Sequence, residues 1–165
     1  LIQISVSEEY FFLIRVSNSS DYLNLKKVLR DSSLTKYFHN AIFDIRFIYE
    51  FYNNDIVISN VKCTKISEKL INESSNFSSL KNLTKKYLDV SLSKEERLSD
   101  WSASKLSDKQ IQYALRDVIY LSRIWSFQKK ELSDLNKLDI AVDSFDYINT
   151  QTKIERMGID NIFSY

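Results

Sequence analysis

Tyr113 and Asp117 are a pair of residues whose types and spacing could do chemistry. Four residues apart on a helix, a phenol and a carboxylate project from the same side, one turn apart. Such a pair could hold a metal ion and orient a water molecule. Most pairs of this kind are instead the edge of a core beside a solvated charge. A function for this pair therefore needs support from a second part of the chain.

A single amphipathic helix over residues 106–125 is predicted to carry this pair. Ser107 and Gln110 have the spacing of a capping box, which satisfies free backbone amides in the first helical turn. Apolar residues recur at helical spacing along one side, namely Ile111, Ala114, Leu115, Val118 and Leu121. The helix should therefore bury that side and hold Tyr113 and Asp117 on a neighbouring one.

A second stretch, residues 36–47, has the sequence KYFHNAIFDIRF. A strand is predicted over 34–39 and a helix over 41–52, which places Asp44 just over one turn into that helix. Functional side chains in α/β folds gather where strands end and helices begin. His39 lies at the same strand end. We expect it to have a structural role rather than to act as a base, because a lone histidine is more often packed than reactive.

The remaining pattern predicts an α/β fold in which a mixed β-sheet is flanked by helices. Alternating and β-branched residues predict a hairpin with strands at 1–6 and 10–16, and a strand or extended segment is expected at 56–59. Further helices are expected at 21–30, 64–71, 79–88, 132–147 and 150–157. No repeat or linker divides the chain, so we expect a single domain over residues 1–165.

Composition limits the classes of function. The formal net charge is +1, so no global basic field attracts nucleic acid and any site for a polyanion must be local. No apolar run approaches the length that crosses a membrane. The single cysteine, Cys63, cannot form an internal disulfide, which favours a reducing cytoplasm.

Six short segments follow one another in a recognisable order. They are N-x-x-F-D at 40–44, C-T-K-I at 63–66, S-L-K-N-L at 79–83, L-S-K at 92–94, S-D-W at 99–101 and Y-x-x-x-D at 113–117. This series resembles the ribonuclease D family of 3′–5′ exonucleases over nearly the whole chain. That family belongs to the DEDD superfamily, with four metal-binding acids, and to its tyrosine subgroup. The resemblance implies a ribonuclease H-like fold for the mixed sheet and its helices.

The resemblance also implies a role for each matching residue. Asp44 would help to hold the second of two metal ions, Asp117 would ligate the first, and Tyr113 would position the attacking water. His39 matches no catalytic position of the family. The metal would be Mg²⁺ or Mn²⁺, because hard divalent cations prefer carboxylate oxygens.

The implied substrate is the single-stranded 3′ end of an RNA, or of a DNA. Local cations and stacking aromatic rings would hold it. Candidate contacts to nucleic acid are Lys81, Lys85, Lys86, Lys94, Arg97 and Trp101. The basic members of this set could equally form a solvated polar face. No protein partner is predictable from the sequence.

The family's first motif, D-x-E, lies on a strand before the one predicted at 1–6, and we expect that first strand to be missing from this chain. Only two of the four acids would then be present. Three hypotheses follow. The protein trims transfer RNA or other small stable RNA precursors from the 3′ end, or it binds RNA without cutting, or it is a structural relative that retains the family's core residues.

Overall fold

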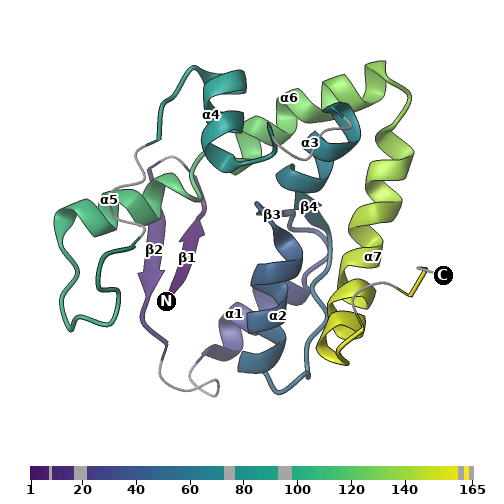
Figure 1. Ribbon diagram of the computed structural model, residues 1–165. Helices are drawn as coiled ribbons and strands as arrows, with labels where there is room; N and C mark the ends of the chain where they lie inside the picture. Colours follow the sequence, from purple (N-terminus) through teal and green to yellow (C-terminus); the bar gives the residue numbers. More distant parts are fainter. Residues whose placement is uncertain (8, 17–21, 73–76, 93–97, 160–161, 164–165) are drawn as a thin grey trace.

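The computed structural model describes residues 1–7, 9–16, 22–72, 77–92, 98–159 and 162–163 (Figure 1). Its strands are β1 (Ile2–Ser5), β2 (Phe11–Ile14), β3 (Lys36–Phe38) and β4 (Val61–Cys63). Its helices are α1 (Leu23–Arg30), α2 (Ala41–Phe51), α3 (Thr64–Asn72), α4 (Leu80–Leu88), α5 (Asp108–Arg116), α6 (Leu121–Asp134) and α7 (Leu138–Arg156). The predicted α/β class is confirmed, and no described helix has both the length and the apolar character needed to cross a membrane.

The strands form two separate sheets in the described part of the chain, where the sequence predicted one mixed sheet. β1 and β2 pair antiparallel, with Ile2 opposite Ile14, as expected for a hairpin. β3 and β4 pair in parallel, with Lys36 opposite Val61. β1 and β3 are the inner strands of the two pairs and face each other in Figure 1. Each has one edge that pairs with no other described strand.

The core lies around β3 and β4, between α2 and α7 on one side and α3 and α6 on the other. Helices α2 and α7 run side by side in Figure 1 and bury Ile45, Tyr49, Phe145 and Ile148 almost completely. Removing such large apolar side chains from water stabilises the fold by about 1.5–3 kcal/mol each. The hairpin of β1 and β2 lies outside this core and is covered by α5.

The prediction of a single helix over residues 106–125 is wrong. The chain turns between Arg116 and Leu121, and this turn separates α5 from α6. Val118 and Ile119 both donate backbone hydrogen bonds to the Leu115 carbonyl, and regular helical bonding stops there. The cause is tertiary packing, since α5 packs on β1 and β2 whereas α6 packs on α3, α4 and β3. One straight helix could not reach both sets of partners.

Of the strand or extended segment expected at 56–59, the structure has the extended segment, since the Asn149 side chain bonds both the amide and the carbonyl of Ile58 in place of a strand. One further predicted boundary is corrected. The helices expected at 132–147 and 150–157 form one helix, α7, over Leu138–Arg156, and Leu132 belongs to α6. The Thr152 hydroxyl donates to the Ile148 carbonyl within α7, so this polar stretch continues the helix.

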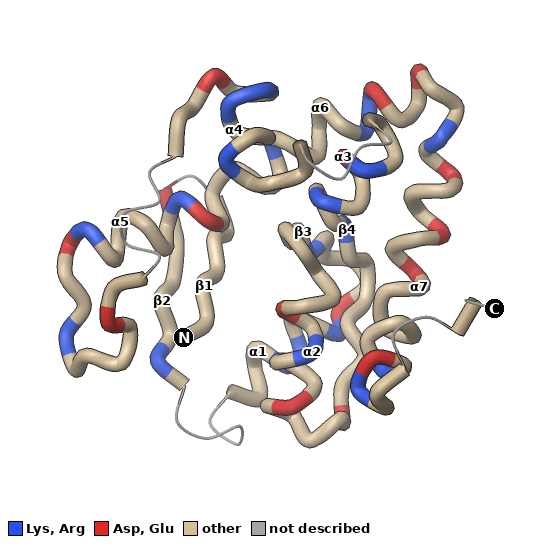
Figure 2. Tube along the Cα trace, viewed as in Figure 1, with Lys and Arg blue, Asp and Glu red and all other residues tan. Residues whose placement is uncertain are grey.

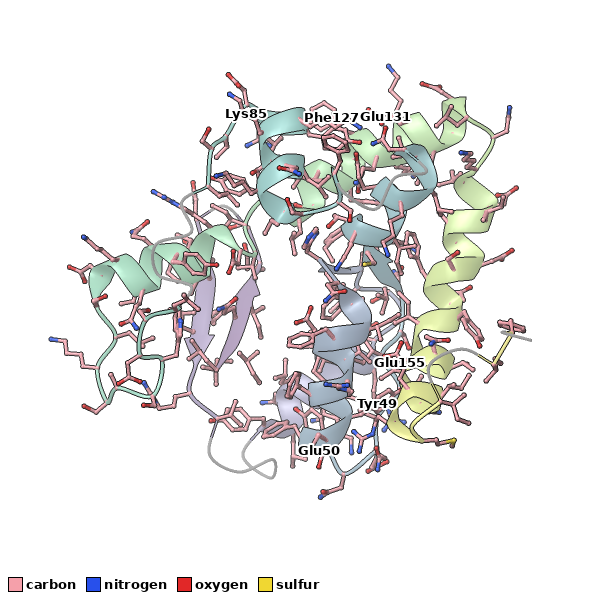
Figure 3. The ribbon with its side chains drawn as sticks, viewed as in Figure 1. Tyr49, Glu50, Lys85, Phe127, Glu131 and Glu155 are labelled. Carbon is pink, nitrogen blue, oxygen red and sulfur yellow. The ribbon has the colours of Figure 1, made fainter. Side chains whose placement is uncertain are left out.

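A buried carboxylate, Glu68 on α3, joins three helices. Its oxygens accept hydrogen bonds from Lys86 Nζ at 3.1 Å, Tyr87 Oη at 2.8 Å and Gln128 Nε2 at 2.9 Å. Lys86 also donates to Glu131, which Figure 3 labels on α6, and Tyr87 Oη lies 3.0 Å from a Glu131 oxygen, so its single proton can be donated to either carboxylate. Glu68 is fully buried whereas the Glu131 side chain is 38% exposed. Water can therefore solvate Glu131, but the Glu68 carboxylate has only its protein donors to replace lost hydration.

Replacing Glu68 by alanine should lower the free energy of unfolding by about 3 kcal/mol, because the buried Gln128 amide on α6 and the partly buried Tyr87 hydroxyl on α4 lose this acceptor. Chemical denaturation measures this loss. Glu131→Ala is the matched control and should lower the free energy by less than about 1 kcal/mol, because its carboxylate is partly solvated. Equal losses in the two variants would contradict a central role for Glu68.

Candidate active site

Asp44 lies in the first turn of α2, directly after the corner that leads from β3 into this helix. The side chain is partly buried, and this desolvation raises the pKa of the carboxyl to about 7. Among the described residues, no cation or hydrogen-bond donor offsets this effect. The Asp44 carboxyl therefore lies just after a strand end, as predicted, and no cation among the described residues balances its charge.

The corner before Asp44 is held by hydrogen bonds to the start of α3. The Thr64 hydroxyl donates to the Phe38 carbonyl at 3.3 Å and lies 2.9 Å from His39 Nδ1. Because the hydroxyl has a single proton, His39 Nδ1 must donate to it. Burial and the positive charge of Lys65 lower the pKa of His39 to about 4, so the ring is neutral at pH 7. These bonds support the structural role expected for His39.

Asn40 completes the corner in an unusual conformation. Its backbone is left-handed, with φ 75° and ψ 48°, a region that asparagine tolerates better than most residues. Its side chain does not cap α2 and instead accepts a hydrogen bond from Lys65 Nζ at 3.3 Å. The Ala41 amide donates to Cys63 Sγ at 3.5 Å.

The three consecutive side chains of the C-T-K segment at 63–65 thus form hydrogen bonds with the β3–α2 corner. Cys63 is buried, and the sequence analysis gave no role to Thr64 or Lys65. Contacts between residues about 25 positions apart leave no trace in local periodicity. The parallel pairing of β3 with β4 creates these contacts, because it places Phe38 opposite Cys63.

Tyr113 and Asp117 lie on α5 and at its end. The predicted capping box is confirmed, since Ser107 Oγ accepts from the Gln110 amide and Gln110 Oε1 accepts from the Ser107 amide. Asp117 is the last, capping residue, and its amide donates to the Tyr113 carbonyl at 3.3 Å. Desolvation raises the pKa of the Asp117 carboxyl to about 6.

Trp101 lies beside Tyr113, with the two ring centroids 6.0 Å apart. Gln110 Nε2 donates to the Asp100 carbonyl, and the Arg15 guanidinium on the other side donates to the Ala103 carbonyl. These bonds attach the segment around Trp101 to both α5 and β2. The structure therefore brings Trp101, Tyr113 and Asp117 into one group.

Asp44 lies on a different helix from that group, since it belongs to α2 whereas Tyr113 and Asp117 belong to α5 and its end. Helices α2 and α5 lie on opposite sides of the space between β1 and β3 in Figure 1. Neither aspartate contributes to the raised pKa of the other, so the two carboxylates are not in direct contact. Within the described part of the chain, no three His, Cys, Asp or Glu residues lie close enough to hold a metal ion.

The donor chemistry nevertheless fits a hard divalent cation in part. Two desolvated carboxylates without an ion-pair partner are the ligand type that Mg²⁺ and Mn²⁺ prefer. Magnesium sites use one or two protein carboxylates and fill other positions with water or phosphate. Asp44 and Asp117 could act as such ligands only if further oxygen atoms join them.

The predicted cationic contacts differ in their surroundings. Lys85 pairs with Asp89 at 2.5 Å, and Lys86 pairs with Glu68 and Glu131, so both have carboxylates that compete with a phosphate. Lys81 is exposed, and Lys94 and Arg97 lie outside the described residues. In Figure 2, basic and acidic positions are interspersed along α5 and α6, whereas α4 carries basic positions only and is followed by Asp89. A nucleic-acid role for these residues stays a prediction.

Comparison with known proteins shows the family. Residues 1–133 match the family described as 3′–5′ exonuclease. The chain belongs to this 3′–5′ exonuclease family. It is 30% identical to DNA polymerase I of Aquifex aeolicus (strain VF5) over 136 residues, which make up 82% of this chain and 22% of the polymerase. The resemblance predicted from six motifs is confirmed at the level of the exonuclease family.

Solved structures agree with this assignment. Brucella melitensis NrnC with bound Mg²⁺ has a TM-score of 0.78 and 33% identity, over 86% of this chain and 69% of that one. Escherichia coli RNase D has a TM-score of 0.73 and 26% identity, over 80% of this chain and 34% of the enzyme. The chain spans only about a fifth of the polymerase and a third of RNase D. The exonuclease fold is therefore confirmed.

The raised pKa of Asp44 predicts a pH-dependent effect of Asp44→Asn on stability. The folded carboxyl binds a proton between pH 3.8 and about 7, where the unfolded one releases it, so native stability falls as pH rises through that window. In metal-free buffer, Asp44→Asn should raise the free energy of unfolding by up to about 4 kcal/mol at pH 8 and change it little at pH 3.

Denaturation curves at the two pH values measure this difference. Asp139→Asn on the exposed surface of α7 removes the same formal charge and should shift stability by less than about 0.5 kcal/mol at either pH. A destabilised Asp44→Asn protein at pH 8 would show that the carboxylate has a favourable partner.

Proposed function

We propose that this protein is a metal-dependent exoribonuclease of the ribonuclease D type, which removes nucleotides one at a time from the 3′ end of RNA. The observation that carries the proposal is the pair of desolvated aspartates, Asp44 on α2, which follows β3, and Asp117 at the end of α5, which packs on β1. Membership of the 3′–5′ exonuclease family supports the reaction type. The Mg²⁺ bound to NrnC supports the choice of cation.

Asp44 and Asp117 would hold the divalent ions in this proposal. When bound, such ions generate a nucleophile from water near neutral pH and stabilise the leaving oxygen. Tyr113, one helical turn from Asp117, would orient the attacking water through its phenol. Trp101 packs against Tyr113 and would keep the ring in place while offering a surface on which a base can stack.

Two carboxylates are few for a two-metal site, and the family's first motif would supply the others. We propose that this acidic motif reaches the site on a strand between β1 and β3, which would join the two sheets into the predicted mixed sheet. The open edges of β1 and β3 support this position. An acid pair on that strand would lie between Asp44 and Asp117.

RNA is the substrate we favour, because E. coli RNase D is described as an exoribonuclease involved in structured RNA processing. Precursors of transfer RNA and other small stable RNAs are the proposed class, acted on in the cytoplasm. A single-stranded DNA end is the alternative substrate, since the chain also matches DNA polymerase I. Catalytically inactive RNA binding is the second candidate function. It is favoured by the absence of a three-acid cluster among the described residues.

In a protein that carries the family's first acidic motif together with these residues, Asp117→Asn should abolish Mg²⁺-dependent shortening of a 5′-labelled, single-stranded RNA with a free 3′-hydroxyl. Gel electrophoresis of the products over time measures the rate, and chelation of Mg²⁺ should stop it in the unmodified protein. Asp139→Asn, which removes the same charge from α7, should leave the rate unchanged. A normal product ladder from Asp117→Asn would remove this residue from the site.

Tyr113→Phe should slow the same reaction about 100-fold, with little change in RNA affinity, because only the hydroxyl that orients water is lost. Single-turnover rates and equilibrium binding separate the two effects. If affinity falls and the rate at saturation does not, Tyr113 stacks on the substrate. RNA binding with no shortening in the unmodified protein would favour the inactive binder.

A further inference from the structure

Lys65 is a cation beside the candidate site that the proposed reaction has not used. It is the second residue of α3 and is half-buried. Its ammonium donates to Asn40 Oδ1 at 3.3 Å, next to the first turn of α2 that carries Asp44. Its charge also reaches His39, whose pKa it lowers. Lys65 is therefore fixed at the β3–α2 corner and does not extend freely into solvent.

The surroundings of Lys65 differ from those of four anchored cations that form ion pairs, namely Lys26 with Asp55, Lys85 with Asp89, Lys86 with Glu68 and Glu131, and Arg156 with Glu50. Lys36 and Arg15 are also held by neutral oxygens, but theirs are backbone carbonyls away from the β3–α2 corner. Lys65 has a neutral amide as its partner, and no described carboxylate forms an ion pair with it. Its positive charge is held in place without being neutralised.

Asp44 is not the counter-charge, although it lies close in the chain to Asn40. The raised pKa of Asp44 has burial as its cause and no contribution from Lys65. The neutral His39 ring adds no negative charge either. A positioned cation and a carboxylate that remain separate can each bind a different part of one ligand. A phosphodiester beside a divalent ion has such parts, since its oxygens can contact both a metal and an ammonium.

We propose that Lys65 binds a phosphate of the nucleic-acid substrate at the β3–α2 corner, with Asn40 holding the ammonium in position. This assignment rests on the proposed function and adds a binding residue to that site. Asn40 would fix the direction of the lysine, so little side-chain freedom is lost when the phosphate arrives. Asn40 has a left-handed backbone, and its side chain contacts the Lys65 ammonium and does not cap α2.

The competing interpretation is that Lys65 only braces the corner. Salt dependence of binding separates the two, because a lysine that neutralises a phosphate releases a counterion and a purely structural lysine does not. Binding of a fluorescein-labelled, single-stranded RNA octamer, without divalent ions so that no cleavage occurs, would be measured by anisotropy over a range of KCl concentrations. Thermal unfolding of each variant would be followed in parallel.

Lys65→Gln keeps an N–H donor for Asn40 but removes the charge. It should weaken binding about fivefold or more at low salt and reduce the slope of log K against log salt by about 0.7. Lys65→Arg should restore the slope, because it returns the charge. Lys129→Gln, an exposed position on α6, removes the same charge and should leave affinity and slope unchanged.

Each outcome decides between the interpretations. If Lys65→Gln shows the native slope, or if the slope falls only as far as in Lys129→Gln, the assignment to Lys65 is wrong while the exonuclease proposal stands. If Lys65→Gln is less stable and Lys65→Arg does not restore the slope, the lysine is a brace. If the unmodified protein does not bind the octamer at all, the proposed function and this assignment both fail.

Discussion

Two aspartates are held partly out of water with no balancing cation among the residues that the structure describes, and the rest of the site depends on this constraint. Desolvation alone moves the pKa of Asp44 to about 7 and that of Asp117 to about 6. A protein with no use for these charges would be more stable with apolar or amide side chains there. A divalent cation is the ligand that would turn this unfavourable arrangement into a favourable one.

The two aspartates are held in position by different means. The position of Asp44 depends on the parallel pairing of β3 and β4, because that pairing brings Thr64 to His39 and Lys65 to Asn40. The position of Asp117 depends on the turn between α5 and α6, because α5 ends at Arg116 and Asp117 is its capping residue. Gln128 joins α6, the helix that follows this turn, to α3, since its amide donates to the Thr64 carbonyl and to Glu68.

Much of this arrangement could be predicted from the sequence where the signal is local. The hairpin, the capping box at Ser107 and the placement of Asp44 at a strand end all follow from neighbouring residues. The break after Arg116 could not, because residues 106–125 keep helical periodicity throughout and only the separate partners of α5 and α6 force a turn. The roles of Thr64 and Lys65 were missed for the same reason, since their contacts cross about 25 residues. The choice between a strand and an extended segment at 56–59 also could not be made from the sequence, because the Asn149 side chain that bonds Ile58 is 91 residues away.

Asp44 and Asp117 are proposed to serve the same two-metal site, and their titration with and without Mg²⁺ tests this most directly. Carboxyl carbon NMR of the protein would follow each side chain across pH 3–9. In metal-free buffer both carboxyls should titrate well above ordinary aspartates, and saturating Mg²⁺ should lower the pKa of both because it favours the charged forms. Two pKa values that Mg²⁺ leaves unchanged, or a shift in only one of them, would contradict a shared metal site.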